Sequence, residues 1–436
     1  MLYPGDDSRT RDLRRDIPST HKNAPRPDTS APRPPAPSAA ARPVPTPELP
    51  FTVAPGDPLQ LAREVLTACR DLGFAQAGIT PARPSAYQDE LTAWLAAGRH
   101  GSMDWLARHA AIRADPARLV PGCASLLMVA DRYAARGSGS RAEPVASGHG
   151  LIARYARGRD YHATIKRRLH GLADTLAARF PAETFRCFVD TAPVLEREHA
   201  ARAGLGWVGK NTLLITPRGG SYVLLGGIAT TLALEPPPEQ EPSPDHCGTC
   251  TRCLDACPTG AITPYSVDAA RCLSYLTIEH RGPIEPGGHA PVGDWLFGCD
   301  VCQEVCPHNS PRPAVAAADA TVHPDYTPRF ASLDLLAVLG WTPADRSRAL
   351  SGSSMKRARL DMLKRNALIV LGNQLARTTA APDAAVVERL RAVAASEAEP
   401  DLVRRTAADV LARLAARDRA ATPVSSGPSP RAEERR

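Results

Sequence analysis

The sequence predicts an α/β domain, then a cysteine-rich module, then a helical region, with polar extensions at both ends of the chain. Helical and strand-like hydrophobic patterns alternate over residues 56–240. Eight of the 11 cysteines lie between residues 247 and 306, and helical periodicity returns over residues 313–418. A chain of 436 residues is long enough to form two or three domains of ordinary size.

The first 55 residues hold 13 of the 43 prolines, mixed with Ala, Ser, Arg and Asp. Such a composition buries too little apolar surface to repay ordering, so residues 1–55 are predicted to be a disordered extension. Arg14 and Arg15 precede polar, proline-rich sequence, whereas a twin-arginine export signal requires an apolar segment there. Because the chain also has no run of about eighteen apolar residues, we expect a cytoplasmic protein without a membrane span.

The pattern over residues 56–240 predicts a series of helices and strands. Helices are expected over residues 59–73, 90–98, 160–180 and 193–205. Strands are expected over residues 74–80, 125–134 and 184–190, followed by two strands within 206–234 that a Pro-Arg-Gly-Gly turn joins. The proline-rich, acidic stretch EPPPEQEPSP then marks the boundary with the module, residues 241–312.

The cysteines of this module follow the spacing of bacterial ferredoxins. The segment CGTCTRCLDACP has the C-x2-C-x2-C-x3-C-P pattern, in which three thiolates meet one cubane and the fourth faces another cluster. The later segment CDVCQEVCP is one cysteine short, and Cys272 can fill the vacancy. Eight thiolates suffice for two 4Fe-4S clusters with crossed ligation, one held by Cys247, Cys250, Cys253 and Cys306 and the other by Cys257, Cys272, Cys299 and Cys302.

Other metal chemistry fits these cysteines less well. Two structural zinc sites would also use four cysteines each, but they do not need the two x3-C-P endings. The C-x3-C-x2-C run of radical S-adenosylmethionine enzymes is absent. The remaining Cys69, Cys123 and Cys187 lie in apolar contexts that favour packing. Two neighbouring clusters conduct single electrons, so the bond chemistry must take place elsewhere in the chain.

The helical region, residues 313–418, is predicted to form HEAT-like repeats, with small Ala and large Leu alternating on the packed faces. It lies in the most basic part of the chain, because residues 311–436 hold 20 Lys and Arg against 14 Asp and Glu, or +6 of the net +7. This distribution favours a polyanionic partner. The last residues, 419–436, are predicted to be a disordered tail.

Several segments resemble the epoxyqueuosine reductase family. They are YARGRDYH at 155–162, VDTAPVLEREHAARAGLGWVGKNTLLI at 189–215, CLSYLTIEHRG at 272–282, WLFGCDVCQEVCPHN at 295–309 and KRNALIVLGN at 364–373. The resemblance extends over about residues 58–416. It implies an oxidoreductase that reduces epoxyqueuosine to queuosine at the wobble position of tRNA anticodons, the last step of queuosine biosynthesis. It also implies a base-off cobalamin held between the α/β domain and the ferredoxin-type module.

The resemblance further implies that Asp190 is the proton donor of this reaction. When an epoxide opens to an alkoxide, an acid must supply a proton before water is lost. This role requires burial beside the corrin ring to raise the pKa of Asp190. From the sequence alone, an aspartate between a strand and a helix is more often a helix N-cap.

The cobalamin contacts that the resemblance implies are Arg113, Ala153, Asp190, Asn211, Leu214, Leu225, Ser274 and the stretch Cys299, Asp300, Val301 and Cys302. For the apolar residues among them, ordinary core packing is an equal alternative. Asp160, Tyr161 and His162 begin like a D-x-H-x-x-G cobalamin box, but Ile165 replaces its glycine. We therefore do not assign His162 as a cobalt ligand.

The tRNA is expected to bind the basic segment KRARLDMLKR. Its candidate contacts are Lys356, Arg357, Lys364 and Arg365, and helical spacing puts the last three on one face. A solvated helix face is the usual alternative for such a segment. Arg281 of EHRG is a further candidate for a contact to the anticodon. The external electron donor is unknown, and we expect a monomer.

Two other functions account for part of the sequence. A reductive dehalogenase resembles this arrangement of cobalamin and two clusters, but it normally carries a working twin-arginine signal and does not need a basic helical C-terminus. A ferredoxin-type electron-transfer protein would explain the cysteines and leave the large α/β domain without a task. A corrin absorption band in the purified chain would exclude the electron-transfer protein.

Overall fold

The computed structural model describes residues 57–137, 145–311, 322–378 and 383–421, all within one compact unit, Pro47–Arg436. The extension predicted for residues 1–55 lies outside the described residues. Helix α15 extends to Ala421, three residues into the tail predicted for residues 419–436, and the rest of that tail lies outside the described residues. Within the described ranges, no helix combines the length and the apolar character that crossing a membrane requires.

The central sheet has four strands in the order β1, β2, β7 and β4, with bounds Gln76–Pro81, Ser125–Arg132, Val223–Thr230 and Phe185–Phe188. All neighbouring strands in this sheet are antiparallel. The predicted alternation of helices and strands is present, but it does not produce the parallel sheet typical of α/β folds. All eight residues of β2 are buried, as expected for a central strand covered on both faces.

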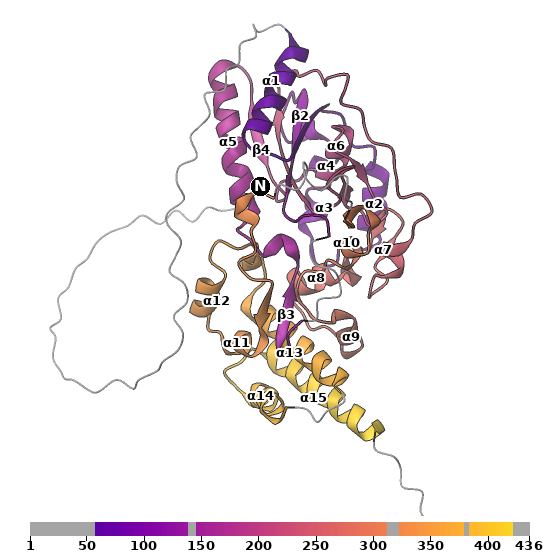
Figure 1. Ribbon diagram of the computed structural model, residues 1–436, viewed down its shortest axis with the longest axis vertical. Helices are drawn as coiled ribbons and strands as arrows, with labels where there is room; N and C mark the ends of the chain where they lie inside the picture. Colours follow the sequence, from indigo (N-terminus) through magenta and orange to yellow (C-terminus); the bar gives the residue numbers. More distant parts are fainter. Residues whose placement is uncertain (1–56, 138–144, 312–321, 379–382, 422–436) are drawn as a thin grey trace, which may run out of the picture. The chain divides into compact units, whose positions relative to one another are not determined.

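Helices cover the two faces of this sheet (Figure 1). Helix α1 (Pro58–Asp71) and helix α5 (Tyr161–Arg179) pack on one face and share a core with Leu127 of β2. Helix α6 (Glu196–Arg202) packs on the other face, against Leu126. Side chains alternate along a strand, so consecutive residues of β2 enter these two separate cores.

Two aspartates cap the N-termini of helices α1 and α5. The Asp57 carboxylate accepts a hydrogen bond from the backbone N–H of Gln60 at 2.9 Å, and Pro58 occupies the first position of α1. The Asp160 carboxylate caps α5 in the same way by accepting from the backbone N–H of His162 at 3.1 Å. The second cap fixes the orientation of the helix start that carries Tyr161 and His162.

Short elements lie between these strands and helices. Helices α2 (Gln88–Ala96), α3 (Trp105–Arg108) and α4 (Ala110–Ala114) occupy the connection from β1 to β2. Strands β5 (Trp207–Val208) and β6 (Leu214–Ile215) form a separate antiparallel hairpin. The predicted Pro-Arg-Gly-Gly turn does connect two strands, but these strands, β6 and β7, belong to different sheets.

A second sheet links the three predicted parts of the chain. Strand β3 (His149–Ile152) pairs in parallel with β10 (Trp295–Phe297) and in antiparallel orientation with β11 (Ser332–Asp334). Residues of β3 and β10 enter one hydrophobic core together with the C-terminal helices. The α/β region, the cysteine module and the helical region therefore share one sheet and one core.

The cysteine module consists of short elements, namely α7 (Arg252–Asp255), β8 (Ile262–Thr263), β9 (Ser266–Val267), α8 (Leu273–Ile278), α9 (His289–Val292) and α10 (Val301–Glu304). The C-terminal helices are α11 (Leu335–Gly340), α12 (Pro343–Ala349), α13 (Leu360–Arg377), α14 (Ala384–Ala395) and α15 (Asp401–Ala421). Helix α13 packs against α11, α15, α9 and β10, and 13 of its 18 residues are buried. The HEAT-like assignment of this region stays a prediction.

Candidate functional site

The first three cysteines of the module and its last cysteine lie together. Desolvation raises the pKa of Cys253, and the nearby thiols of Cys306, Cys247 and Cys250 raise it further. Desolvation also raises the pKa of Cys306, and the nearby thiols of Cys247 and Cys250 raise it further. Because the loop between Cys247 and Cys250 is exposed, we call these four residues the outer cysteine set.

The other four cysteines, which we call the inner cysteine set, also lie together. Desolvation raises the pKa of Cys299, and the thiols of Cys272 and Cys257 contribute. The pKa of Cys302 lies well above its ordinary value, first because of desolvation and then because of Cys299 and Cys272. All eight are free thiols. Among the described residues, no three His, Cys, Asp or Glu side chains lie close enough to hold a single metal ion.

A buried ion network joins the inner set to the segment after β3. Asp300, in the inner-set loop, accepts hydrogen bonds from the backbone N–H of Arg154 at 2.8 Å and from its guanidinium at 3.0 Å. The same guanidinium donates to Glu304 at 2.7 Å. A Cβ placed on Gly298 would lie only 2.6 Å from the Cβ of Ala153. Two predicted cobalamin contacts, Ala153 and Asp300, therefore lie on two segments whose backbones pack closely against each other.

Asp190 lies on a strained turn between β4 and α6. Its φ is 50°, in the left-handed region that aspartate adopts at an energetic cost. Its backbone N–H donates to Glu196 Oε1 at 2.6 Å, and the N–H of Thr191 donates to the carbonyl of Val189 at 2.5 Å. The N-cap of α6 is Leu195, so Asp190 is not the cap that the sequence allowed as an alternative. Its side chain is 60% exposed, which leaves the carboxylate accessible to a substrate.

Two side chains at the start of α5 contact the Asp190 carboxylate. Tyr161 Oη donates to Oδ2 at 2.6 Å. His162 Nε2 lies 3.4 Å from the same oxygen, and His162 Nδ1 lies 2.8 Å from Oδ1 of Asp160. The rings of Tyr161 and His162 stack with their centroids 4.1 Å apart. The imidazole is therefore placed between two carboxylates.

These contacts determine the charges in the group. Desolvation acts to lower the pKa of His162, but its interactions with Asp160 and Asp190 raise the pKa to about 9. Desolvation acts to raise the pKa of Asp190, but His162 and Tyr161 bring it below its ordinary value. In the chain by itself the Asp190 carboxylate therefore faces an imidazolium at neutral pH, and the raised pKa expected for Asp190 beside a corrin ring stays a prediction.

Two further side chains adjoin Asp190. The pKa of Glu196 is raised to about 8, first by desolvation and then by the charge of Asp190. Desolvation lowers the pKa of Arg113, whereas its electrostatic interactions with Glu196 and Asp190 act to raise it. The Arg113 Nε is buried and has no hydrogen-bond partner in the described part of the chain. The predicted cobalamin contact Arg113 therefore lies near the Asp190 turn, and its Nε–H has no acceptor among the described residues.

The remaining predicted cobalamin contacts differ in burial. Asn211 is 5% exposed, and its side-chain Nδ2 finds no hydrogen-bond partner among the residues described. Leu214 and Val301 are buried within hydrophobic cores. Leu225 and Ser274 are partly buried. The unsatisfied amide of Asn211 is the observation that favours a ligand, whereas core packing accounts for the leucines and the valine.

The structure corrects part of the predicted tRNA surface. Arg365 is fully buried. Its guanidinium donates to three backbone carbonyl groups of the module, those of Leu276, His280 and Gly282. Lys364 is only 7% exposed and pairs with Glu399 at 2.6 Å. Their prediction as phosphate contacts is wrong, because the packing around α13 turns both side chains inward.

The other predicted basic residues are accessible. Lys356 is exposed, and its charge acts on Asp160. The Arg357 side chain is 53% exposed and pairs with Glu279 at 2.7 Å. Arg281 is also exposed. Lys356 therefore places positive charge beside the group that contains Asp190.

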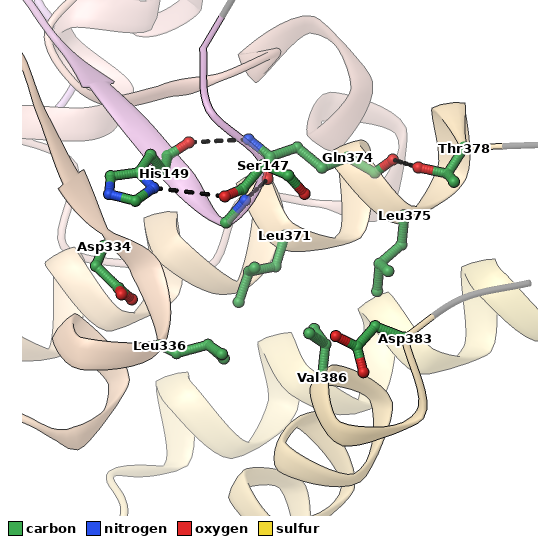
Figure 2. Close-up of a pocket in the computed structure, with 11 residues that line it drawn as sticks. Ser147, His149, Asp334, Leu336, Leu371, Gln374, Leu375, Thr378, Asp383 and Val386 are labelled. Carbon is green, nitrogen blue, oxygen red and sulfur yellow. Dashed lines mark hydrogen bonds between the residues drawn. The ribbon is translucent and has the colours of Figure 1, made fainter. Parts of the chain in front are cut away.

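A pocket of about 250 Å³ lies between β3, α13 and α14 (Figure 2). Gln374 connects α13 to the start of β3. Its Nε2 donates to the carbonyl of His149 at 2.8 Å, and its Oε1 accepts from the N–H of Gly148 at 3.0 Å. None of the described residues that line this pocket is a predicted site residue. We do not assign it to the reaction.

Sequence reasoning missed Tyr161 and Glu196 as partners of Asp190, and it considered His162 only as a cobalt ligand. The available signal was the position of these residues in YARGRDYH and VDTAPVLER, two of the segments on which the resemblance rests. The contact between Tyr161 and Asp190 joins residues 29 positions apart, so local patterning could not reveal it.

Two family models match the chain. A model described as epoxyqueuosine reductase QueG, DUF1730 matches residues 113–191. A model described as a 4Fe-4S double cluster binding domain matches residues 246–309. The first match includes Arg113 and Asp190, and the second includes all eight clustered cysteines.

Curated proteins named epoxyqueuosine reductase align with most of the chain. The protein from Xanthomonas campestris pv. campestris is 41% identical over 322 residues, which are 73% of this chain and 88% of that protein. The protein from Alicycliphilus denitrificans is 38% identical over 81% of this chain and 98% of its own length. The Escherichia coli K12 protein is 37% identical over 73% of this chain and 83% of its own length.

Solved structures share the fold. A crystal structure of epoxyqueuosine reductase with an epoxyqueuosine-modified tRNA-Tyr stem loop is 29% identical, has a TM-score of 0.71, and covers 82% of this chain and 91% of that one. The Bacillus subtilis enzyme, in a structure whose catalytic loop is swung out of the active site, is 28% identical with a TM-score of 0.70, covering 82% and 91%.

Proposed function

Because the chain belongs to the epoxyqueuosine reductase family, we propose that its two cysteine sets, its Asp190 group and a bound cobalamin act together in that family's reaction. The chain is an oxidoreductase that reduces epoxyqueuosine to queuosine in tRNA. The observation that carries this assignment is the 41% identity over 73% of the chain. The experiment that tests it is conversion of epoxyqueuosine-containing tRNA by the purified protein.

The residues of the site fit a cobalamin and two 4Fe-4S clusters. Eight free cysteines in two sets match the ligand number of two cubanes. The buried donors without partners, Arg113 Nε and Asn211 Nδ2, would bind polar groups of the corrinoid. When bound, cobalamin would supply two-electron chemistry at the epoxide carbon, with electrons delivered singly through the clusters from an external donor.

Asp190 and His162 supply one of the two protons that the reaction consumes, and the other comes from water. Removal of the epoxide oxygen consumes two electrons and two protons and releases water. Asp190 gives one proton to the ring oxygen as the ring opens. Before substrate binds, this proton rests on His162, 3.4 Å away. When tRNA covers the exposed carboxylate, loss of water disfavours the charged pair, and the proton moves from His162 Nε2 to Asp190 Oδ2.

This proton route predicts a characteristic pH dependence. The pKa of His162 is raised to about 9, so the imidazole stays charged through neutral pH and loses its proton as the pH rises through that value. When tRNA is limiting, the rate reports the free protein, so the single-turnover rate should be flat near neutral pH and fall above about pH 9. In His162→Gln the remaining rate should lack this alkaline decline. A control variant, His170→Gln on the exposed side of α5, should keep the native profile.

The tRNA approaches the Asp190 group over an accessible basic surface, which we define as Lys356, Arg357 and Arg281. Lys356 acts on Asp160, which holds His162. The pairing of Arg357 with Glu279 brings the 3-10 turn Ser354–Arg357 to the segment that also contains Arg281. These positive charges suit the phosphate backbone of tRNA near the anticodon. Because the substrate is tRNA, the proposed function places the protein in the cytoplasm.

Two substitutions should separate tRNA binding from folding. Lys356→Gln is expected to weaken tRNA binding and to lower the slope of log affinity against log salt concentration by about 1, because one phosphate contact is lost. Arg365→Met should instead lower the free energy of unfolding by about 3 kcal/mol, because buried carbonyl groups lose their donor. Binding titrations at several salt concentrations and urea unfolding measure these effects. Equal loss of binding in both folded variants would contradict the assignment of Lys356.

A further inference from the structure

Trp105 is a large apolar side chain that lies outside the hydrophobic cores of the described part of the chain. It is the first residue of α3, a helix without a buried residue, and it is partly exposed. None of the hydrophobic clusters that the described residues form includes it. A tryptophan usually contributes its large apolar surface to a core or to an interface. Core packing therefore does not explain why an indole is placed at this position.

A guanidinium group lies over this indole. The Cζ atom of Arg357 is 5.2 Å from the centroid of the Trp105 ring, within the range of a cation–π interaction. Glu279 accepts hydrogen bonds from Arg357 Nε at 2.7 Å and from its Nη2 at 2.8 Å. Two hydrogen bonds to one carboxylate fix the orientation of the planar guanidinium. We call Trp105 and Arg357 the indole–guanidinium pair.

The chain before Trp105 is docked on the cysteine module. The Tyr275 hydroxyl accepts a hydrogen bond from the backbone N–H of Ser102 at 2.8 Å and lies 2.8 Å from the Ser102 hydroxyl. Gly101 has a φ of 58°, and a Cβ on it would lie only 2.5 Å from the same Tyr275 oxygen. These contacts hold the start of α3 against α8 and thereby set the position of the indole.

A short segment connects the indole–guanidinium pair to the Asp190 group. The backbone N–H of Asp160 donates to the carbonyl of Gly352 at 2.8 Å, and Arg357 follows Gly352 by five residues. Asp160 Oδ1 is also the atom that lies 2.8 Å from His162 Nδ1. Five residues span at most about 18 Å. An RNA loop whose modified base meets Asp190 therefore lies close to the pair.

We propose that the indole–guanidinium pair stacks on a nucleobase of the anticodon loop next to the modified base. An enzyme that acts on a base takes it out of its stack, so the neighbouring base loses a stacking partner. An aromatic ring or a guanidinium plane can replace that partner, as in the recognition of other single-stranded loops. The positive charge of Arg357 suits the adjoining phosphates. This inference deepens the proposed function and rests on it for the identity of the RNA.

The first test is titration of the complete protein with an anticodon stem loop that contains epoxyqueuosine, at several salt concentrations. Trp105→Ala should weaken binding by about 5- to 150-fold, the usual contribution of one stacked base. It should leave the slope of log affinity against log salt concentration unchanged, because no phosphate contact is lost. Trp105→Phe keeps a ring and should recover most of the affinity. Tyr87→Ala, which removes an exposed aromatic side chain before α2, should bind like the native protein.

A double-mutant cycle then identifies the partner base. The stem loop is prepared with an abasic site at each of the two nucleotides that flank the modified base in turn. With one of these loops the native protein should lose affinity and Trp105→Ala should lose no more, because the stacked pair is already absent. Losses that add for both loops, or unchanged binding by Trp105→Ala, would overturn the inference.

Two further outcomes are decisive. A lower salt slope in Trp105→Ala would mean a lost phosphate contact and would speak against stacking. If Trp105→Ala does not fold, Trp105→Leu decides, because leucine fills the site without a ring, and native affinity in that variant would refute stacking. Native protein that binds the stem loop but does not convert its epoxyqueuosine would contradict the proposed function, whereas the binding cycle is independent of turnover.

Discussion

An Asp190→Asn variant is expected to bind cobalamin and both clusters and to lose turnover by a factor of about 10² to 10⁴, the usual contribution of a general acid. The amide keeps the size of the carboxylate and can still accept the hydrogen bond from Tyr161, but it cannot carry the proton to the ring oxygen. The measurement is the single-turnover rate of epoxyqueuosine loss, followed by nucleoside mass analysis after rapid quenching.

A matched control makes the result specific. Asp89→Asn changes an exposed aspartate in the first turn of α2 and should leave the rate and the cofactor content unchanged. Native turnover in Asp190→Asn would exclude Asp190 as the proton donor. Loss of cobalamin together with turnover would instead assign Asp190 to cofactor binding.

Single cysteine variants should reveal the crossed ligation directly. Cys247→Ser and Cys306→Ser, at opposite ends of the module, are expected to lose the same cluster, because both belong to the outer set. Cys272→Ser and Cys302→Ser should lose the other cluster. In each case iron should fall from about eight to about four atoms per chain. Iron analysis and electron paramagnetic resonance of anaerobically purified protein identify which cluster remains.

Cys123→Ser is the control for these variants. Cys123 is a half-buried thiol outside the module, and its removal should leave all of the iron in place. If the Cys247 and Cys306 variants retained different clusters, the crossed assignment would be wrong. Zinc in place of iron in the native protein would contradict cluster ligation altogether.

The sequence predicted which cysteines lie together, because ferredoxin-type ligation follows short spacings, and the role of these cysteines as cluster ligands stays a prediction. The vacancy before Cys299 pointed to Cys272, and the structure places that thiol beside Cys257. The α/β class was predicted only in part, because alternation along the chain does not determine strand direction. The antiparallel sheet depends on pairings such as β2 with β7, which lie far apart in sequence.

The basic segment shows why helical spacing is insufficient to predict a binding surface. Spacing placed Arg357, Lys364 and Arg365 on one face, but α13 packs on several sides, and the face that carries Arg365 meets the cysteine module. Only tertiary packing separates the accessible Lys356 from the buried Arg365. The charge count identified the region correctly as basic without showing which side chains reach solvent.

The role of Asp190 is predicted from the resemblance alone, and the contacts that set the charge of its carboxylate were not predicted. Desolvation alone would have raised its pKa, but Tyr161 and His162 outweigh that effect. Their positions depend on the Asp160 cap at the start of α5 and on the turn held by Glu196. Such contacts between separate segments arise only in the folded chain.

The most direct test of the account is the purified chain, loaded anaerobically with iron–sulfur clusters and cobalamin, acting on tRNA that contains epoxyqueuosine. Nucleoside mass analysis should show the loss of one oxygen atom from the modified base, only when cobalamin and an electron donor are both present. Protein that holds both cofactors and a reductant but leaves epoxyqueuosine unchanged in bound tRNA would contradict the central claim.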